Sequence, residues 1–154
     1  MNIDFSSLTL VPADESHREF SYRVKKEAEG DYIARVWGWD ERVQRQFHAR
    51  DWEESRPEII QYCGKPIGTI LVEENDEYIR IRQFFVLPEY QNRGIGSYIL
   101  KNVLDRADRK GCVTRLTFMK NNPVESLYRR HGFEVTGDDE HFSFMERKPG
   151  IIDG

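Results

Sequence analysis

The sequence predicts a mixed α/β fold organised as a single domain. The chain has 154 residues, which is enough to bury one core of ordinary size. Hydrophobic residues make up 38% of the chain and charged residues 32%, a balance typical of globular proteins with a polar surface. Segments with strand-like alternation follow segments of helical periodicity, and no repeat or long linker divides them. We therefore expect strands and helices that share one core.

Composition also disfavours several classes of protein. A net charge of −4 and a pI near 5.6 make attraction to nucleic acid improbable. No apolar run approaches the roughly 18 residues of a membrane-spanning helix, and the N-terminus lacks the pattern of a secretory signal. Cys63 and Cys112 do not have metal-ligand spacing. The sequence predicts a cytoplasmic protein without a metal, a nucleic-acid partner or a membrane partner.

The first third of the chain predicts one strand and two helices. Asp14 or Ser16 can cap the first helix, and Gly30 ends its pattern. Asp40 can cap the second helix, whose apolar residues recur at helical spacing. The expected elements are a strand over 5–11, a helix over 18–29, a short segment over 32–37 and a helix that follows Asp40.

The middle of the chain predicts a meander of three strands. Gly64-Lys65 and Asn75-Asp76 are turn pairs that separate apolar segments. The expected strands cover 58–63, 66–74 and 78–86.

The third strand of this meander has an interrupted pattern. Ile79 and Ile81 face one way, and Arg80 and Arg82 face the other. The alternation fails after Gln83, where an apolar block follows. A β-bulge would produce such a break, and so would a strand end that is buried on both faces.

The last third predicts two helices and three strands. Apolar residues at helical spacing, followed by Gly111 in the usual stop position, indicate a long helix. The expected elements are a helix over 94–110, a strand over 113–119, a short helix over 124–130 and a hairpin of strands over 133–135 and 142–146.

A glycine-containing turn joins the third meander strand to the long helix. Its sequence is Gln91-Asn92-Arg93-Gly94-Ile95-Gly96. Backbone N–H groups at a helix start have no intrahelical partner, and with the helix dipole they form an anion site suited to a pyrophosphate. Gly94 and Gly96 allow close approach of phosphates, and Gln91 and Arg93 can add donors. The chain has neither a Gly-x-Gly-x-x-Gly fingerprint nor the Lys-Ser/Thr pair of a P-loop.

Two segments in this order resemble motifs of the GNAT family of N-acetyltransferases. Residues 85–96 look like the acetyl-CoA loop of that family. Residues 121–133 resemble its second motif, in which an asparagine stands seven residues before a tyrosine and Gly-Phe follows. The resemblance covers about 56–147, whereas 1–55 fit only in topology. It implies a GNAT-like, mostly antiparallel sheet flanked by helices, with one acetyltransferase domain over 1–148 and a tail over 149–154.

The resemblance also implies roles for individual residues, with acetyl-CoA as co-substrate and no metal. Strand backbone would pair with the pantetheine arm, the loop would hold the pyrophosphate, and Asn121 would contact the cofactor near the pantetheine. Tyr128 would lie by the thioester sulfur as the general acid. Val124 stands where the family often has alanine. The cofactor-binding residues assigned in this way are Phe84, Phe85, Val86, Gln91, Asn92, Arg93, Gly94, Ile95, Gly96, Ser97 and Asn121.

The acceptor is expected to be an amine of a small molecule or peptide. Trp37 and Trp39 could form an aromatic wall for a cationic amine, with Asp40 pairing with its charge. The alternative is a packing cluster in which Asp40 caps a helix. Arg80 and Arg82 could hold an acceptor carboxylate, or they could occupy an exposed strand face.

The sequence does not identify the general base. Many relatives carry a glutamate on the strand before the loop, where this chain has Arg80, Arg82 and Gln83. Other side chains could act directly or through water, although each could instead be a surface charge. These are Glu41, Glu73, Glu74 and His48.

The sequence therefore predicts transfer of an acetyl group from acetyl-CoA to a primary amine by direct attack. One alternative is a catalytically silent acyl-CoA-binding sensor, which the missing strand glutamate favours. A nucleotide-binding protein is a weaker third interpretation. A homodimer is possible by analogy with the family.

Overall fold

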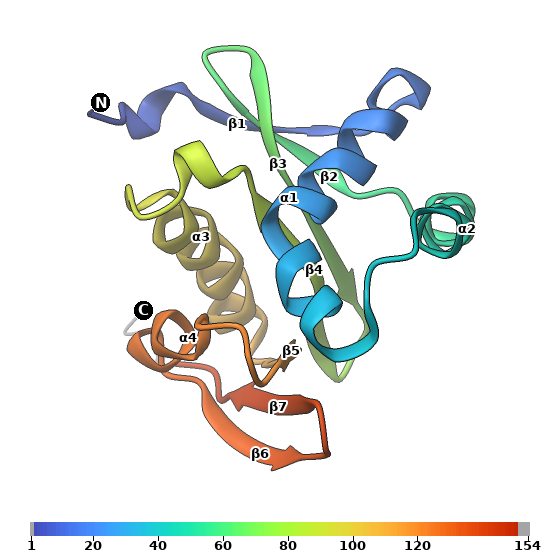
Figure 1. Ribbon diagram of the computed structural model, residues 1–154. Helices are drawn as coiled ribbons and strands as arrows, with labels where there is room; N and C mark the ends of the chain where they lie inside the picture. Colours follow the sequence, from blue (N-terminus) through green and yellow to red (C-terminus); the bar gives the residue numbers. More distant parts are fainter. Residues whose placement is uncertain (1, 151–154) are drawn as a thin grey trace. The chain divides into compact units, whose positions relative to one another are not determined.

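The computed structural model describes residues 2–150 and confirms the mixed α/β class. Its strands form one sheet in the order β1-β2-β3-β4-β5-β7-β6 (Figure 1). The pairs β1/β2, β2/β3, β5/β7 and β6/β7 are antiparallel, and β4/β5 is parallel. The strands are β1 (Leu8–Pro12), β2 (Glu58–Tyr62), β3 (Lys65–Glu74), β4 (Tyr78–Val86), β5 (Val113–Met119), β6 (Glu134–Asp138) and β7 (Phe142–Arg147).

The chain divides into two compact units. The first comprises 2–71 and 83–95, and the second comprises 72–82 and 96–150, so that β3 and β4 each contribute to both. Of the predicted tail over 149–154, residues 151–154 lie outside the described part of the chain. The helices are α1 (Arg18–Trp37), α2 (Glu41–Glu54), α3 (Ile95–Lys110) and α4 (Glu125–Arg130), with 3₁₀ turns η1 (Phe5–Ser7), η2 (Glu15–His17) and η3 (Pro88–Tyr90).

The core of the first unit is formed by consecutive buried residues of β2 and β3 and by one side of each helix. Ile59, Ile67 and Ile70 are fully buried, as is Val24 of α1, and Trp52 of α2 is buried with 2% of its surface exposed. Burial of such side chains stabilises a fold by roughly 1.5–3 kcal/mol each. Short apolar runs that are buried on both faces thus form the centre of the sheet in this unit.

The predicted end of the first helix at Gly30 is wrong. α1 continues through 32–37 and ends before Gly38, which has a φ of 75° and donates its N–H to the carbonyl oxygen of Ala34. Gly30 lies inside the helix, with no positive φ. A glycine in a helix interior costs about 1 kcal/mol relative to alanine, and burial of Ile33 one turn later offsets this.

Several further boundaries differ from the sequence prediction, among them that of β6, which covers Glu134–Asp138 rather than 133–135. The hairpin turn between β2 and β3 is formed by Cys63 and Gly64, with φ values of 51° and 78°, rather than by Gly64 and Lys65. Positive φ at both central residues is what a type I′ turn requires, because its twist matches that of the strands. The first strand begins at Leu8, after a 3₁₀ turn capped by the carboxylate of Asp4.

The second unit contains the predicted long helix and the closing hairpin. The buried side of α3 includes Val103, Leu104 and Ala107. Gly111 has a φ of 71° and follows the last helical residue, as the sequence indicated. The hairpin of β6 and β7 is confirmed, and Met145 of β7 is buried.

Candidate functional site

The end of β4 loses its alternation at the predicted residue. Ile79 and Ile81 are buried and Arg80 and Arg82 are exposed, whereas residues 83–86 are all half-buried. These side chains therefore do not form a strand end buried on both faces. The expected bulge stays a prediction.

A glycine on β3 makes room for the end of β4. A Cβ atom added to Gly68 would overlap the carbonyl oxygen of Phe85 and lie 3.2 Å from the Cα atom of Val86. The N–H of Leu87 donates to the carbonyl oxygen of Ile67 at 2.8 Å, next to this contact. Sequence reasoning missed Gly68, although a single glycine within an apolar strand often marks a close backbone approach.

The turn between η3 and α3 has a left-handed backbone at two positions. Asn92 has a φ of 59° and Gly94 a φ of 83°. Asparagine tolerates this conformation better than most residues, and glycine adopts it without a steric penalty. Turns of this kind group backbone N–H donors into a concavity, and a helix N-terminus adds its own donors. The local backbone is therefore suited to an anion.

The side chains of Gln91 and Arg93 brace this turn. The Nε2 atom of Gln91 donates to the carbonyl oxygen of Val86 at 2.9 Å, and the Nε atom of Arg93 donates to that of Glu89 at 3.0 Å. Both contacts hold the turn against the segment that leads into it. The phosphate-binding role expected for both side chains stays a prediction.

The two glycines of the loop have different surroundings. A Cβ atom on Gly94 would lie 3.1 Å from the Cζ atom of Phe5, an N-terminal residue that sequence reasoning did not connect with the loop. A Cβ atom on Gly96 would lie 3.6 Å from the Cδ2 atom of Leu127, an ordinary contact between α3 and α4. At position 94, both the positive φ and the nearby ring of Phe5 therefore favour a residue without a side chain.

Tyr128 lies in the second unit with its ring held by two phenylalanines. Its side chain is buried, with 7% of the residue exposed. The ring centroid is 5.6 Å from that of Phe133 and 6.1 Å from that of Phe118. Its carbonyl oxygen accepts from the N–H groups of His131 and Phe133 at the end of α4. The predicted Tyr-x-x-x-Gly-Phe spacing therefore places Phe133 against Tyr128.

Asn121 and Ser97 are the other predicted cofactor residues of this unit. Asn121 is exposed in the turn between β5 and α4, and the N–H of its neighbour Lys120 donates to the carbonyl oxygen of His141 at 2.9 Å. Ser97 is half-buried in the first turn of α3. Their roles toward a cofactor stay predictions.

The predicted acceptor residues of the first unit occupy different environments. Trp37 is 55% exposed at the end of α1. The Nε1 atom of Trp39 donates to Glu41 at 2.9 Å, and the ammonium of Lys26 lies 5.8 Å from the centroid of its ring. Asp40 caps α2 by accepting from the N–H of Val43. Trp39 and Asp40 thus have the packing and capping contacts of the alternative interpretation.

Three charged residues of β3 and β4 form ion pairs within the second unit, namely Glu73, Glu74 and Arg82. Arg82 donates to Glu73 at 2.8 Å. Glu74 lies 2.6 Å from Arg106 and 3.1 Å from Lys110. Glu73 and Glu74, two of the candidates for the general base, are therefore engaged with cations.

Two glutamates of the first unit differ in proton affinity. Hydrogen bonds from Trp39, Lys26 and Tyr22 lower the pKa of Glu41 to about 2, which makes it a poor base. Burial raises the pKa of Glu29 on α1, the direction that a base needs for work near neutral pH. Sequence reasoning missed Glu29, because the surrounding segment of α1 is rich in charged residues.

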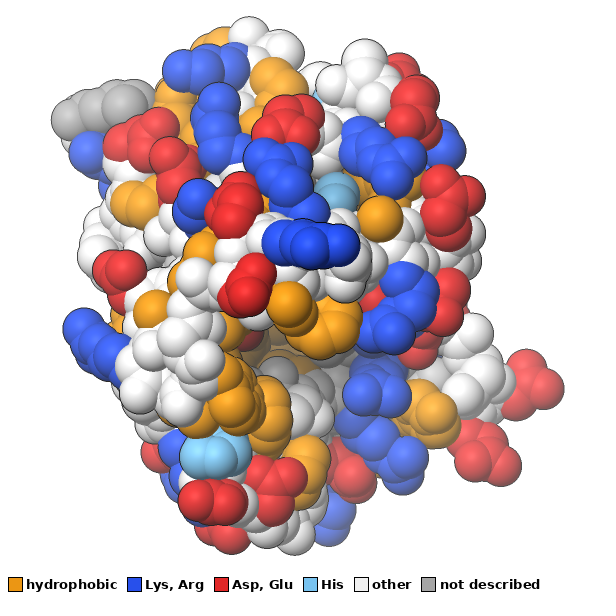
Figure 2. Space-filling view, turned by 45° about the vertical axis from the view of Figure 1, so that its right-hand side comes forward, with side chains coloured by type: hydrophobic (Ala, Val, Ile, Leu, Met, Phe, Trp, Pro, Cys, Tyr) orange, Lys and Arg blue, Asp and Glu red, His pale blue; other side chains and the backbone are white. Residues whose placement is uncertain are grey.

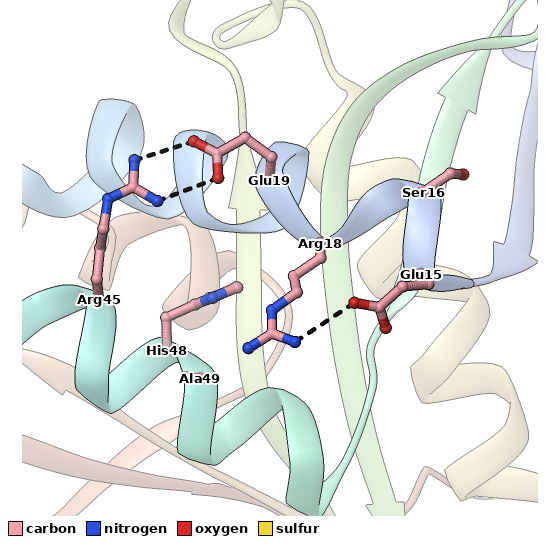
Figure 3. Close-up of a pocket in the computed structure, with 7 residues that line it drawn as sticks. All are labelled: Glu15, Ser16, Arg18, Glu19, Arg45, His48 and Ala49. Atoms are coloured by element: carbon pink, nitrogen blue, oxygen red, sulfur yellow. Dashed lines mark hydrogen bonds and ion pairs between the residues drawn. The ribbon is translucent and has the colours of Figure 1, made fainter.

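A pocket of about 420 Å³ lies in the first unit, against η2, α1 and α2 (Figure 3). Arg45 donates to both oxygens of Glu19 at 3.0 Å, and Arg18 donates to Glu15 at 3.3 Å. Figure 2 likewise shows positive and negative side chains interspersed on the face that it displays. The charges at this pocket are therefore largely neutralised by one another. Its lining residues are Glu15, Ser16, Arg18, Glu19, Arg45, His48 and Ala49.

His48 connects this pocket to the packing between α1 and α2. Its Nε2 atom lies 3.1 Å from the Oγ atom of Ser21. Its ring stacks on Trp52 with centroids 5.9 Å apart and meets Tyr22 edge-on at 5.6 Å. Burial lowers the pKa of His48 from 6.5, as do the charges of Lys25 and Arg18, while Asp51 and Glu19 oppose them.

We expect the stability of the protein to decrease as His48 becomes protonated. Because its pKa is lower in the folded state, His48 contributes fully above the unfolded pKa of about 6.5, and the contribution is lost as the pH falls through the folded pKa. Urea unfolding at a series of pH values measures this effect. The His48→Gln variant should show a shallower decrease of the unfolding free energy below that pH. An identical slope in both proteins would contradict the assignment.

Two kinds of feature are not found in the described part of the chain. None of the helices within 2–150 is long and apolar enough to cross a membrane. Over the same residues, no three side chains of His, Cys, Asp or Glu converge as metal ligands.

The sequence model of the acetyltransferase (GNAT) family matches residues 15–133. Among curated proteins, the chain is 31% identical to the UPF0157 protein YqkA of Bacillus subtilis over 101 residues, which cover 64% of this chain and 29% of that protein. The chain spans less than two fifths of the length of the curated relatives it matches.

Solved structures show the same fold. The PaiA N-acetyltransferase of Thermoplasma acidophilum, solved in complex with coenzyme A, is 19% identical with a TM-score of 0.70, covering 92% of this chain and 99% of that one. PH1933 of Pyrococcus horikoshii OT3 is 17% identical with a TM-score of 0.73, covering 94% and 99%. Together with the family match over residues 15–133, which includes the left-handed turn and Tyr128, these likenesses show that the chain belongs to the GNAT family of acetyltransferases.

Proposed function

We propose that this chain transfers an acetyl group from acetyl-CoA to a primary amine of a small molecule or peptide, through one catalytic domain over 1–148. The observation that carries the proposal is the left-handed turn at Asn92 and Gly94, which leads directly into α3. A turn of this geometry at a helix start suits the pyrophosphate of coenzyme A. The complex of the PaiA enzyme with coenzyme A supports this choice of anion.

The proposed cofactor site uses backbone more than side chains. In this proposal, the backbone of Phe84, Phe85 and Val86 pairs with the pantetheine arm, and the turn and first helical residues hold the pyrophosphate. Arg93 adds positive charge close to the phosphates, and Asn121 contacts the cofactor near the pantetheine. This division explains why the turn requires left-handed backbone, whereas Gln91 and Arg93 serve partly as braces.

We expect Gly94→Ala to weaken the binding of coenzyme A about tenfold, or ~1.4 kcal/mol. A Cβ atom at this φ is strained, and it would press on Phe5, so that the turn must change shape. Isothermal titration calorimetry with coenzyme A measures the effect.

Gly111→Ala is the matched control, because Gly111 has a similar φ of 71° and no atom within 4 Å of an added Cβ. This variant should lose similar backbone stability and keep its affinity for coenzyme A. Equal affinities of the two variants would place the pyrophosphate elsewhere.

The proposed reaction is a direct attack. The amine must first lose a proton, because an alkyl ammonium with a pKa near 10.4 is not a nucleophile. The neutral nitrogen forms a bond with the thioester carbonyl carbon while the carbon–sulfur bond breaks, and a backbone N–H such as that of Val86 stabilises the developing oxyanion. Tyr128 donates its proton to the leaving thiolate, whose pKa is near 8.5, and the acetylated nitrogen loses its second proton to a base or solvent.

The proposed acceptor contacts are two tryptophans, one aspartate and two arginines. Trp37 has more than half of its surface exposed and stays a proposed contact for a cationic amine. Trp39 and Asp40 are also proposed contacts, although Lys26 lies beside the ring of Trp39 and Asp40 caps α2. Arg80 and Arg82 are the proposed partners of an acceptor carboxylate.

A thiol-release assay with acetyl-CoA tests the function. The panel of acceptors should include amino acids, polyamines, aminoglycosides and peptide N-termini. Release of coenzyme A that requires one class of amine, together with an acetylated product in mass spectrometry, would support the enzyme. Binding of acetyl-CoA without release across the whole panel would favour a silent acyl-CoA sensor. Tighter binding of ATP or NAD than of coenzyme A would overturn both the enzyme and the sensor interpretations.

A further inference from the structure

A half-buried ion pair in the second unit joins α3 to the end of β7. Arg147 donates from Nη1 to Oδ1 of Asp108 at 2.7 Å and from Nη2 to Oδ2 at 3.2 Å. The two side chains have relative exposures of 15% and 17%. The hydrogen bonds from Arg147 hold the pKa of the Asp108 carboxyl below its usual value. A two-point contact of this kind fixes the plane of the guanidinium as well as its position.

The fixed guanidinium reaches the end of α4. Its Nε atom donates to the carbonyl oxygen of His131 at 3.0 Å. The Arg147 side chain also passes Gly132, where a Cβ atom would lie 3.6 Å from Nε. Gly132 has a φ of 92°, so the chain reverses at this point without a side chain in the way. Arg147 therefore holds the turn that ends α4.

Tyr128 belongs to the same short turn. Its carbonyl oxygen accepts from His131 and Phe133, and its ring packs against Phe133. α4 has only six residues, so it has few hydrogen bonds of its own to fix its orientation. The position of the Tyr128 ring thus depends on the contacts that fix the last turn of α4, including the hydrogen bond from Arg147 to His131.

We propose that Asp108 and Arg147 are positioning residues that hold Tyr128 in place for proton donation. This inference rests on the proposed function, in which Tyr128 is the general acid. Neither residue touches the reacting atoms. The pair acts through the carbonyl oxygen of His131 and the turn at Gly132.

Asp108 also accepts a hydrogen bond from the N–H of Gly150 at 2.7 Å. A purely structural role, in which the pair only fastens the chain after β7, would lower stability without changing the surroundings of Tyr128. A probe of the Tyr128 ring distinguishes the two roles.

Fluorine NMR of protein labelled with fluorotyrosine provides this probe without any ligand. The resonance of Tyr128 is assigned by its absence in Tyr128→Phe. In Asp108→Asn this resonance should shift or broaden, and it should change at least as much in Arg147→Lys, which keeps the charge but loses the Nε donor to His131. Asp105→Asn, which removes an exposed carboxylate from the same helix, is the matched control and should leave it unchanged. An unchanged Tyr128 resonance in folded Asp108→Asn overturns the proposal. If that variant does not fold, an unchanged Tyr128 resonance in Arg147→Lys overturns the proposal instead.

Kinetics provide the second readout, with acetyl-CoA and the panel amine that is turned over fastest. Asp108→Asn should lower kcat about tenfold, because a small misplacement of a catalytic group is costly. The KM for acetyl-CoA should stay within about twofold, since an interaction needed only in the transition state lowers kcat without weakening ground-state binding. In a Tyr128→Phe background the substitution should cause no further loss, and an additional loss there would overturn the proposal. If Tyr128→Phe is itself as active as the wild type, the acid role of Tyr128 fails, while the fluorine spectra still decide whether the pair positions the ring.

Discussion

Replacing Tyr128 with phenylalanine should lower kcat about a hundredfold and leave the affinity for coenzyme A largely unchanged. The substitution removes one hydroxyl group and keeps the ring, which packs between Phe118 and Phe133. Without a proton donor, the thiolate must leave as an anion, which raises the barrier of the bond-breaking step. Steady-state thiol release gives kcat, and calorimetry with coenzyme A gives the affinity.

Tyr78→Phe is the matched control for this prediction. Tyr78 is a half-buried tyrosine of the same unit, with the guanidinium of Arg115 stacked 4.5 Å from its ring centroid. Removing its hydroxyl should leave both kcat and affinity unchanged. If Tyr128→Phe retains the wild-type kcat, Tyr128 is a core tyrosine and another group protonates the thiolate. If it loses affinity in proportion to rate, the hydroxyl serves in binding.

Gly68→Ala should be the most destabilising of the single substitutions considered, by about 3 kcal/mol. The added methyl group would overlap the carbonyl oxygen of Phe85, and backbone of a neighbouring strand cannot move aside as a flexible side chain can. The end of β4 must therefore shift or separate from β3. Urea unfolding followed by circular dichroism measures the loss of stability.

The same substitution should weaken coenzyme A binding in the fraction that remains folded, because the proposed pantetheine contacts lie at Phe84–Val86. Gly137→Ala in β6 is the control. Its added Cβ would lie 3.7 Å from a ring carbon of Phe144, an ordinary contact, so its stability should change by less than about 1 kcal/mol. Similar destabilisation by the two substitutions would show that the strands accommodate the methyl group at Gly68.

Features that depend on neighbouring residues in the chain could be predicted from the sequence. β4 and β5 have the predicted bounds, because alternation of apolar residues directly reports burial on one face. Asp40 caps α2 and Gly111 follows α3, since both positions depend on local backbone hydrogen bonds. The turn before α3 was also predictable, because Gly94 and Gly96 stand directly before the apolar residues that recur at helical spacing.

Features that depend on distant segments could not be predicted in this way. α1 passes through Gly30 because tertiary packing outweighs a helix propensity of about 1 kcal/mol. Glu73 and Glu74 look like available bases in the sequence, but cations from other segments pair with them. Glu29 is the opposite case. It looks like a surface charge in a charged stretch of sequence, but burial in the folded protein raises its pKa.

The sequence by itself determined the class of fold, the order of its elements and the turn suited to an anion, because each follows from periodicity and backbone conformation over a few residues. Only the tertiary structure decided that Gly68 receives the end of β4, that Phe5 lies beside Gly94, and that Arg147 joins Asp108 to the turn after Tyr128. These contacts join residues far apart in the chain. Their geometry is set by the packing of whole elements, which no local pattern of residue types encodes.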